Sequence, residues 1–346
     1  MNEYIFMALT ALISFVVAFL LGFVLIPWLR KLKFGQTILD IGPAWHKSKQ
    51  GTPVMGGLMF IISTIVSVAV TVIVARVMGN DIMRPIAVSW TGAAAINKIK
   101  VYAGILLAVG FGAIGFLDDY IKVVKKRNKG LSIIQKTIPQ LVISLAYLAT
   151  LYQCGAHYMY IPFVGNVDLG WFFFIFGICV IYGGINAVNF TDGVDGLCAS
   201  VTAAASVGFI IIAVLHSFFG MGIVASALFG GCLGYLIWNW HPAKVMMGDT
   251  GSMFLGGLVV ALAYMIDCPI ILLFIGIIYV IEGMSDVIQI GYFKITHGKR
   301  IFKMAPIHHH FEMSGWKETK IVIVFTIINL IGAVIGAAIY YYGKIV

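Results

Sequence analysis

The chain has 346 residues, of which 61% are hydrophobic and only 11% are charged, and its formal net charge is +9. Soluble domains are about 45–50% apolar and about 25% charged, so this composition excludes an ordinary soluble protein and indicates a membrane protein. The basic residues flank apolar segments and do not form one stripe, which favours anionic lipid and phosphorylated substrates over nucleic acid as partners.

Apolar segments long enough to cross a bilayer occupy most of the chain. Each contains roughly 20 residues, the length a helix needs to cross a hydrocarbon core about 30 Å thick. In chain order the ten predicted spans are residues 5–29, 54–78, 99–117, 136–152, 169–188, 197–217, 222–238, 251–267, 270–295 and 319–343. We therefore expect an all-α polytopic membrane protein with about ten transmembrane helices, in which residues 1–346 form a single integral membrane domain.

Lysine and arginine residues are unequally divided between the two sides that these spans define. Of the 23, 18 lie on one side. Cytoplasmic loops of membrane proteins carry an excess of these residues, so we expect that side to be cytoplasmic. The predicted cytoplasmic loops are about 30–53, 118–135, 189–196, 239–250 and 296–318, and both termini then face outward.

The predicted outer face has one candidate for regular structure outside the spans. Residues 158–173 alternate apolar and polar side chains around Gly165 and Asn166, which is typical of a small β-hairpin, although an irregular loop is the alternative. Cys154 and Cys268 lie near this face, but the five cysteines have no metal-type spacing, and structural disulfides are not expected.

Acidic residues are rare in this chain, and several lie at the predicted cytoplasmic ends of spans. Asp118 and Asp119 end the third span, and Lys122 follows one helical turn later, so a continuing helix would bring all three together. A solvated pair at the membrane interface, balanced by the following lysines, is the alternative. Carboxylates gathered at one membrane face indicate a metal-dependent active site.

The segment NFTDGVDGL joins two spans and concentrates polar groups. Asn189, Thr191, Asp192 and Asp195 lie there, and Gly193 lets the backbone approach a ligand closely. Helix capping by Thr191 or Asp192 is one interpretation, but it does not explain two aspartates and two glycines together. An open helix N-terminus with these groups favours a pocket for a polar, phosphate-linked ligand.

Asp249 in MMGDTGS is either a cap of the eighth span or a metal ligand. The preceding loop supplies Asn239, His241 and Lys244, a dense polar set for a short connection. Mg²⁺ typically takes one or two carboxylates and fills its octahedron with substrate phosphate and water. We therefore favour Asp249 as a Mg²⁺ ligand, with Asp118 and Asp119 as further candidate ligands.

Three consecutive histidines, His308, His309 and His310, lie in the last predicted cytoplasmic loop. Adjacent residues do not converge easily on one tetrahedral zinc ion, so donation to phosphate or sugar oxygens is the preferred interpretation. On the ninth span, Glu282 is either a functional group or the partner in a buried hydrogen bond to a neighbouring helix. Gly283 is expected to bend that span.

Five motifs carry a resemblance to a known family. They are HKSKQGTPVMGG, GFLDDYIKVVKKRNKGL, NAVNFTDGVDGL, WNWHPAKVMMGDTGS and RIFKMAPIHHHFE. Together they resemble the phospho-N-acetylmuramoyl-pentapeptide transferase (translocase I) family, within the polyprenyl-phosphate N-acetylhexosamine-1-phosphate transferase superfamily. The aspartate motifs are shared across the superfamily, whereas SKQGTPVMGG and APIHHHFE indicate the muramoyl-pentapeptide member. The resemblance covers nearly the whole chain.

The resemblance implies a ten-helix enzyme at the cytoplasmic face of the bacterial inner membrane. The family transfers phospho-MurNAc-pentapeptide from UDP-MurNAc-pentapeptide to undecaprenyl phosphate, forms lipid I and UMP, requires Mg²⁺ and is typically a homodimer. By resemblance, the catalytic residues are Asp118, Asp119 and Asp249, with Asp249 on the metal. The implied substrate-binding residues are Lys49, Thr52, Lys122, Lys136, Asn189, Asp192, Gly193, Asp195, Asn239, Gln289, His308, His309 and His310.

The resemblance also divides these residues among parts of the substrates. Three lysines, Lys49, Lys122 and Lys136, would neutralise phosphate charge, and Asp118 and Asp119 would handle the lipid phosphate. The uridine side of the cleft would be formed by Asn189, Asp192, Gly193 and Asp195, with Asn239 close by. The phosphate or sugar side would be contacted by Gln289, His308 and His309.

Phosphoryl-transfer chemistry agrees with this assignment. A phosphate monoester is largely dianionic at neutral pH, so the attacking oxygen needs orientation and charge neutralisation more than deprotonation. Direct attack with Asp118 as base or orienter is favoured over a covalent intermediate on Asp119. Transfer of GlcNAc-1-phosphate from UDP-GlcNAc is the close alternative function, and a secondary transporter is a more distant one.

Overall fold

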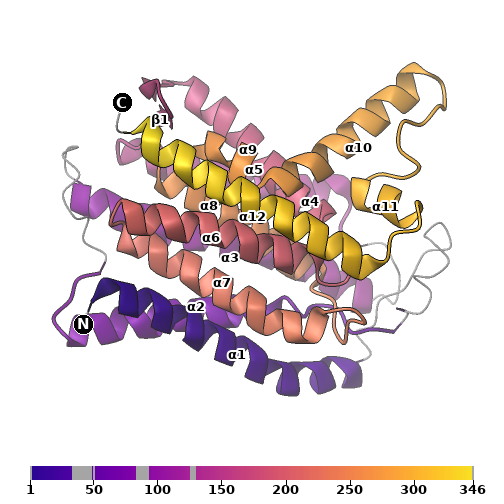
Figure 1. Cartoon of the computed structure of the whole chain (residues 1–346), viewed down its shortest axis with the longest axis horizontal. Helices are drawn as coiled ribbons and strands as arrows, with labels where there is room; N and C mark the ends of the chain where they lie inside the picture. The colour runs from indigo at the N-terminus through magenta and orange to yellow at the C-terminus, as the bar shows by residue number, and fades with distance from the viewer. Residues whose placement is uncertain (1, 33–48, 50, 83–92, 125–129, 345–346) are drawn as a thin grey trace.

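The computed structural model describes residues 2–32, 49, 51–82, 93–124 and 130–344 (Figure 1). Most of the predicted loop 30–53 and residues 125–129 of the predicted loop 118–135 lie outside the described residues. The long helices are α1 (Glu3–Lys31), α2 (Leu58–Val77), α3 (Ala93–Val124), α4 (Ile133–Gln153), α5 (Phe172–Phe190), α6 (Leu197–Leu215), α7 (Phe219–Asn239), α8 (Gly248–Met265), α10 (Ile277–Ile295) and α12 (Glu318–Gly343). The shorter elements are β1 (Tyr158–Ile161), β2 (Gly165–Asp168), η2 (Pro269–Ile271), α9 (Leu272–Ile275) and α11 (Ile307–Glu312).

The described helices confirm an all-α polytopic membrane protein. Eight of them are long and apolar enough to cross a membrane, and the bent pair Pro269–Ile275 and Ile277–Ile295 makes a ninth if it is one span. Helix α4 is not among the eight, because Gln135, Lys136 and Gln140 make its first two turns polar. The expected number of about ten is therefore reached only if α4 and the bent pair each count as one passage.

Helix α4 nevertheless runs the length of the bundle. At its start, Lys136 Nζ lies 3.0 Å from Asp249 Oδ2 at the beginning of α8. It leads into β1, where the backbone N–H of Tyr160 donates to the carbonyl of Asp267, just beyond the other end of α8, at 2.7 Å. The first turn of α1 and the last turn of α12 lie at one end of the bundle, as an even number of passages requires (Figure 1).

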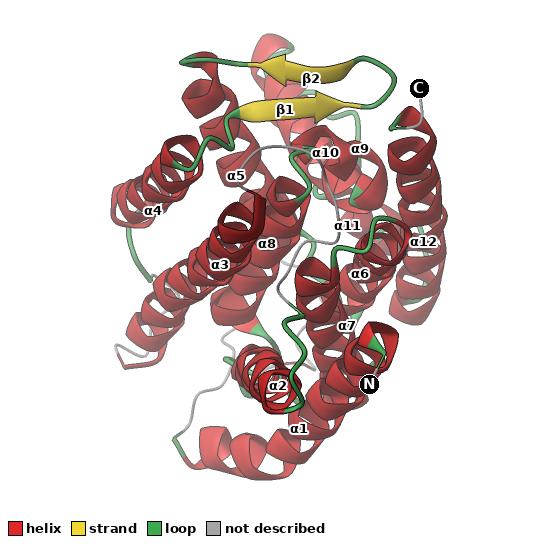
Figure 2. Cartoon of the chain, turned by 90° about the vertical axis from the view of Figure 1, so that its left-hand side faces the viewer, coloured by secondary structure: helices red, strands yellow, loops and turns green. Residues whose placement is uncertain are grey.

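The two ends of the bundle are named here by what they carry. The aspartate end holds Asp118, Asp119 and Asp249. The hairpin end holds β1 and β2 (Figure 2). A two-stranded hairpin is confirmed, but its predicted turn at Gly165-Asn166 is wrong, because Gly165 pairs with Ile161 and Asn166 with Tyr160. Residues 162–164 form the turn instead, since Pro162 has no backbone N–H with which to continue the ladder.

Close packing of α3 against α8 places the aspartates together. An added Cβ on Gly257 of α8 would lie 2.9 Å from Ala108 Cα, and one on Gly115 of α3 would lie 2.1 Å from the carbonyl oxygen of Asp249. Neither position has room for a side chain, so glycine permits the two helices to touch through their backbones. Helix α8 is the most enclosed of the candidate spans, with 89% of its apolar window buried.

Two sequence expectations about helix geometry need correction. The third span was expected to end at residue 117, but α3 continues to Val124, so Asp118 and Asp119 are helical residues with Lys122 on the same helix. The ninth span was expected to bend at Gly283, but the 92° bend falls between Ile275 and Ile277.

Asn329 of α12 holds the bend at Gly276 in place. Its side chain accepts from the backbone N–H of Ile278 at 3.2 Å and donates to the carbonyl of Ile275 at 3.0 Å. Because a break in a helix frees backbone groups that cannot stay unpaired inside a membrane, a buried amide that satisfies both sides stabilises the bend. Gly283 lies within α10 and packs towards Ala187.

Candidate active site

Three aspartates from two helices converge at the aspartate end. Asp118 and Asp119 come from the last turns of α3, and Asp249 comes from the first turn of α8. Each offers a carboxylate oxygen, and these oxygens lie within 4.8 Å of one another. Asp118 and Asp119 are only 3% and 2% exposed, so these charges are removed from water and must be balanced by neighbours.

Two lysines supply that balance. Lys122 Nζ lies 2.5 Å from Asp118 Oδ2 and 2.9 Å from Asp249 Oδ2, and Lys136 Nζ lies 3.0 Å from the same oxygen of Asp249. Lys122 reaches Asp119 Oδ1 at 3.7 Å. Among the described residues, three carboxylates face two ammonium groups, so these five side chains, if fully ionised, carry one uncompensated negative charge. Such a cluster attracts a further cation.

Asn189, at the end of α5, is part of this cluster. Its Nδ2 donates to Asp249 Oδ1 at 2.8 Å and to Ser252 Oγ at 2.7 Å. Both oxygens of Asp249 are therefore held, one by Asn189 and the other by the two lysines. The structure thus brings Asn189 to Asp249, the candidate metal ligand, whereas the family resemblance implied that Asn189 lies on the uridine side of the cleft.

Asp118 and Asp119 are fixed by different partners. Asp119 Oδ2 accepts from the backbone N–H of Thr250 at 2.9 Å and from its hydroxyl at 2.7 Å. Asp118 Oδ1 accepts from the backbone N–H of Leu131 at 2.7 Å. An added Cβ on Gly130 would lie 2.4 Å from Asp118 Oδ1, so the backbone before α4 fits closely over that carboxylate.

The ligand atoms of this cluster fit a hard divalent cation. Carboxylate oxygens are the donors that Mg²⁺ selects in proteins, and it keeps several positions for water and substrate phosphate. The described residues place no cysteine or histidine in the group formed by Asp118, Asp119 and Asp249. An all-oxygen set of this kind does not suit a thiolate or imidazole metal such as zinc.

A second cluster surrounds Asp195, which is 3% exposed. Lys49 Nζ lies 2.8 Å from Asp195 Oδ1 and 2.7 Å from Glu318 Oε2. His241 Nδ1 lies 3.1 Å from Asp195 Oδ2. Burial alone lowers the pKa of Lys49, but hydrogen bonds and charge attraction from Asp195 and Glu318 outweigh it, so its pKa is raised. The ammonium group therefore acts as the resident cation between these two carboxylates.

Sequence reasoning assigned no role to Glu318 or Thr250. Glu318 is the last residue of the predicted cytoplasmic loop 296–318. It lies in the first turn of α12, where acidic residues are common. Thr250 is part of the GDTGS motif, which did signal a polar site. His241 was noticed only as part of a polar loop, and its contact with Asp195 depends on two loops 46 positions apart.

The segment between α5 and α6 contains Asp192, Gly193 and Asp195. The carboxylate of Asp192 has no hydrogen bond or ion pair with the described residues, and burial together with the nearby charges of Asp249 and Asp119 raises its pKa well above the usual range. Asn239 accepts from the Gly196 N–H at 3.0 Å. It also donates to the Val245 carbonyl at 2.9 Å, so it ties this segment to the loop before α8.

The implied residues of the last loop have separate partners. Gln289 Oε1 accepts from the backbone N–H groups of Ile301 and Phe302 at 3.1 and 3.0 Å, so it anchors the loop itself. His308 Nδ1 lies 2.9 Å from Glu282 Oε2, and both side chains are fully buried. The buried-hydrogen-bond interpretation of Glu282 is therefore the one the structure shows.

The other two histidines also point to different groups. His309 Nδ1 lies 2.6 Å from Glu312 Oε2, and His310 Nδ1 accepts from the backbone N–H of Lys303 at 3.1 Å. Within the part of the chain that the structure describes, the three rings do not form a group that could hold a metal ion. Thr52 contributes a backbone N–H that donates to the carbonyl of Lys49 at 3.1 Å.

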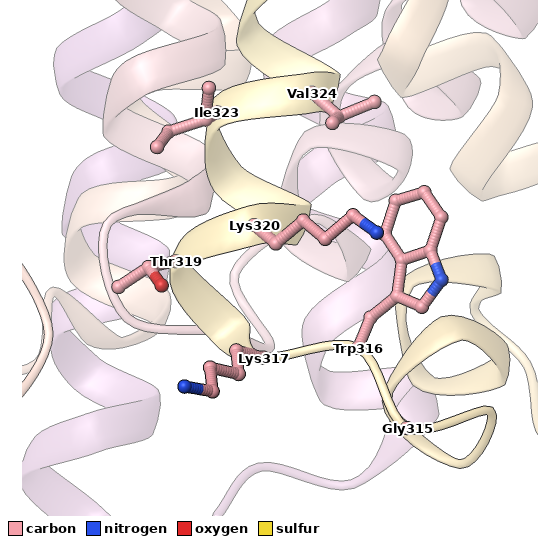
Figure 3. A pocket seen from close by; sticks show the side chains of 7 residues that line it. All are labelled: Gly315, Trp316, Lys317, Thr319, Lys320, Ile323 and Val324. Atoms are coloured by element: carbon pink, nitrogen blue, oxygen red, sulfur yellow. The ribbon is translucent and has the colours of Figure 1, made fainter.

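A cavity of about 430 Å³ opens where α12 begins (Figure 3). Its lining includes Trp316, Lys317 and Lys320, and Lys320 Nζ lies 4.0 Å from the centre of the Trp316 ring. Glu318, in the same helical turn, does not line the cavity and instead binds Lys49. The start of α12 therefore connects this surface hollow to the Asp195 cluster.

Part of the chain matches a family of known proteins. The model of the Glycosyl transferase family 4 matches residues 101–267, the stretch that contains Asp118, Asp119, Asp192, Asp195 and Asp249. This central part of the membrane bundle is thus similar to the glycosyl transferases of that class.

Curated relatives define the class more narrowly. A phospho-N-acetylmuramoyl-pentapeptide-transferase of Acetivibrio thermocellus is 45% identical, over 94% of this chain and 92% of the relative. Proteins of the same name from Halalkalibacterium halodurans and Listeria monocytogenes are 43% and 44% identical, over 95% and 96% of this chain and 95% and 99% of their own lengths. The chain belongs to the phospho-N-acetylmuramoyl-pentapeptide-transferase family.

Proposed function

We propose that this protein transfers phospho-MurNAc-pentapeptide from UDP-MurNAc-pentapeptide to undecaprenyl phosphate, forming lipid I and UMP. Relatives that carry the transferase name match 94–95% of this chain, at 42–45% identity. The single structural observation that supports the activity best is the convergence of Asp118, Asp119 and Asp249 with Lys122 and Lys136 at one end of a membrane bundle.

The three aspartates are the proposed Mg²⁺ site, with Asp249 as the main ligand. When bound, Mg²⁺ would neutralise charge on the pyrophosphate and on the departing UMP. Asn189 orients Asp249 through its Oδ1, and Lys122 and Lys136 lie beside its Oδ2, so a phosphate that reaches this carboxylate also meets two ammonium groups. Fixed positive charge in a site shielded from water is an effective stabiliser of phosphoryl transfer.

The partners of Asp118 and Asp119 favour direct attack by the lipid phosphate. The oxygen Oδ2 of Asp119 already accepts two hydrogen bonds from Thr250, so this carboxylate is held for support and is poorly placed as a nucleophile. Asp118 keeps one oxygen on Lys122, the residue that would also meet the incoming phosphate. We assign Asp118 the role of base or orienter. Isolation of a phosphorylated enzyme from the UDP substrate alone would contradict this assignment.

The segment between α5 and α6 is the proposed uridine side. The carboxylate of Asp192, which has no hydrogen bond or ion pair with the described residues, is available to a ligand, Gly193 lies against His308 Nε2, and Asn239 holds the segment in place. Lys49 lies at the same segment through Asp195. When a ligand enters here, Lys49 would exchange its contacts with Asp195 and Glu318 for contacts with the phosphate of the ligand. The ammonium group would then stay paired with an anion throughout.

The proposed activity also implies an orientation in the membrane and an oligomeric state. We place the aspartate end at the cytoplasmic face of the bacterial inner membrane, because most of the basic residues lie in the loops of that end. The polyprenyl tail would remain in hydrocarbon beside α10, which leaves the bundle at its bend, while the phosphate head reaches the aspartates. Loops 30–53, 118–135, 189–196, 239–250 and 296–318 then face the nucleotide substrate, and the protein is proposed to act as a homodimer.

One assay separates the proposed activity from its alternatives. Purified protein in detergent with undecaprenyl phosphate is supplied with UDP-MurNAc-pentapeptide or with UDP-GlcNAc, with and without Mg²⁺, and UMP release is measured. We expect Mg²⁺-dependent release only from the muramoyl substrate. Release from UDP-GlcNAc alone would favour the GlcNAc-1-phosphate transferase, and substrate counterflow in liposomes without any UMP would favour a transporter.

A further inference from the structure

Helix α10 carries polar side chains on one face, at Glu282, Asp286 and Gln289. Gln289 binds the backbone of residues 301–302, and Glu282 binds His308 at the start of α11. The helix therefore holds the final loop at two points, seven residues apart. Gln289 binds only backbone, whereas Glu282 binds a side chain that reaches towards the candidate site.

The contact between Glu282 and His308 leaves two buried atoms unsatisfied. Glu282 Oε2 lies 2.9 Å from His308 Nδ1, and both side chains are 0% exposed. The other carboxylate oxygen, Glu282 Oε1, and the other ring nitrogen, His308 Nε2, have no hydrogen-bond partner among the described residues. A buried polar atom without a partner is unfavourable, so a ligand that pairs with His308 Nε2 gains from the interaction.

The free nitrogen points at the segment that bears Asp192. An added Cβ on Gly193 would lie 2.1 Å from His308 Nε2, so the ring takes the space that a side chain there would need. Because Nε2 has no exposed surface, a ligand meets it only after Gly193 moves away from the ring. If the Gly193 segment moves, the imidazole of His308 must stay in place. The carboxylate of Glu282, which lies 2.9 Å from Nδ1, is the group that holds it.

We propose that Glu282 is a positioning residue for the transferase reaction: it accepts from His308 Nδ1–H and thereby directs the unprotonated Nε2 to accept from a hydroxyl or amide N–H group of the nucleotide sugar. This inference rests on the proposed function. A carboxylate behind an imidazole selects which nitrogen carries the proton and fixes the ring plane. Glu282 itself does not touch the substrate. Its effect passes entirely through His308, and that dependence makes the proposal testable.

A double-mutant cycle measures the dependence. The full-length protein and the variants Glu282→Leu, His308→Ala and the double variant are compared by kcat/KM for UDP-MurNAc-pentapeptide. We expect Glu282→Leu to lose about 10- to 100-fold, because a displaced group costs roughly that much. The double variant should be within about threefold of His308→Ala alone, since residues that act as one unit are not additive. Losses that multiply, or full activity of Glu282→Leu, would overturn the proposal.

Conservative variants separate positioning from mere support of the fold. Glu282→Gln keeps an oxygen that can accept from Nδ1–H, so we expect it to recover activity to within about fivefold of wild type, with an unchanged KM for undecaprenyl phosphate. If Glu282→Leu does not fold, Glu282→Asp replaces it, because the shorter side chain withdraws the acceptor and should lower kcat/KM in a folded protein. Wild-type kcat/KM in Glu282→Asp would count against the proposal.

A matched pair at the hairpin end serves as control. His157 Nδ1 lies 3.0 Å from Asp168 Oδ1, the same kind of contact outside the site. Asp168→Leu should leave kcat/KM within about twofold of wild type and produce no coupling with His157→Ala. A wrong proposed function would be recognised separately from a wrong role for Glu282. In that case even the wild-type protein would release no UMP from UDP-MurNAc-pentapeptide in any of these assays.

Discussion

Asp119 accepts two hydrogen bonds from one residue, the N–H and the hydroxyl of Thr250, although 131 positions separate them in the chain. This pair joins the end of α3 to the start of α8 inside the aspartate cluster. Neighbouring Asp118 and Asp249 share Lys122 across the same two helices. The aspartate cluster therefore also joins α3 to α8. Its geometry depends on uncharged groups, the backbone N–H and the hydroxyl of Thr250, as well as on the charged side chains.

The hydroxyl of Thr250 should matter to both stability and activity. Thr250→Val keeps the shape and the backbone N–H but removes the 2.7 Å hydroxyl donor from a buried carboxylate. We expect a loss of about 1–3 kcal/mol in unfolding free energy and a lower kcat, measured by thermal unfolding and UMP release. Thr150→Val is the control, because the exposed Thr150 hydroxyl bonds only to a carbonyl of its own helix. Equal effects in both variants would contradict the prediction.

Removal of charge from Asp249 should abolish Mg²⁺-dependent turnover. In Asp249→Asn one ligand oxygen becomes an amide nitrogen, and Lys122 and Lys136 lose their shared partner. We expect UMP release to fall about 100- to 1,000-fold or more, as when a main electrostatic contact is lost. Asp168→Asn, an exposed aspartate of the hairpin, should retain activity. A variant at Asp249 with wild-type Mg²⁺ dependence would remove this residue from the metal site.

Gly130 should tolerate no side chain. In Gly130→Ala the new methyl group would lie 2.4 Å from Asp118 Oδ1, so the carboxylate or the backbone before α4 must shift. We expect kcat to fall roughly 10- to 100-fold with little change in KM for the nucleotide, because the shift affects the reacting end of the site. Gly291→Ala, which meets no atom within 4 Å, is the matched control. Wild-type kcat in Gly130→Ala would show that Asp118 has room to move.

The stability that the ion pairs of Lys49 contribute should not change with pH in the physiological range. Its pKa is raised above the ordinary 10.5 by Asp195 and Glu318, against the opposing effect of burial. A raised folded-state pKa contributes stability that is complete below the unfolded pKa and lost as pH rises through the folded value. The difference in thermal stability between wild type and Lys49→Met should therefore be constant from about pH 7 to 9 and decrease above about 10.5. A difference that disappears below pH 9 would refute this.

The bend before α10 should depend on Asn329. Asn329→Leu preserves volume but leaves the Ile278 N–H and the Ile275 carbonyl without partners inside the bundle. Each lost bond costs about 1–3 kcal/mol, so we expect a clearly lower thermal midpoint in detergent. Asn166→Leu, on the exposed side of the hairpin, tests whether any loss of an asparagine has the same effect. No destabilisation in Asn329→Leu would mean that the bend needs no side-chain support.

Much of the architecture could be predicted because the membrane restricts local structure so strongly. Long apolar segments must be helices, since nothing else pairs the backbone groups in hydrocarbon. The hairpin was also predictable from alternation, although its turn was misplaced: Asn166 is a good turn residue, and only the pairing with Tyr160 shows that it lies in the strand. The bend was assigned to Gly283 because glycine marks flexible positions, but Gly276 is the one that Asn329 supports.

The candidate site was only partly predictable. Motif spacing indicated Asp118, Asp119, Asp192, Asp195 and Asp249, because clustered carboxylates are costly near a membrane unless they have a function. It could not indicate that Asn189 binds Asp249 or that Glu318 meets Lys49, since those contacts join segments 60 and 269 positions apart. Glu318 and Thr250 lie in the first turns of helices, where polar residues are common, so nothing in the sequence assigns either of them a role of its own.

The sequence by itself determined the membrane class, the approximate spans and the residues from which a phosphoryl-transfer site is built, because hydropathy and local motifs are properties of neighbouring residues. Tertiary structure decided which of those residues meet. Backbone contact through Gly115 and Gly257 brings α3 onto α8, and only that packing places Lys122 between Asp118 and Asp249. Charge pairing across helices depends on distances in space, and these are set by how closely the helices pack.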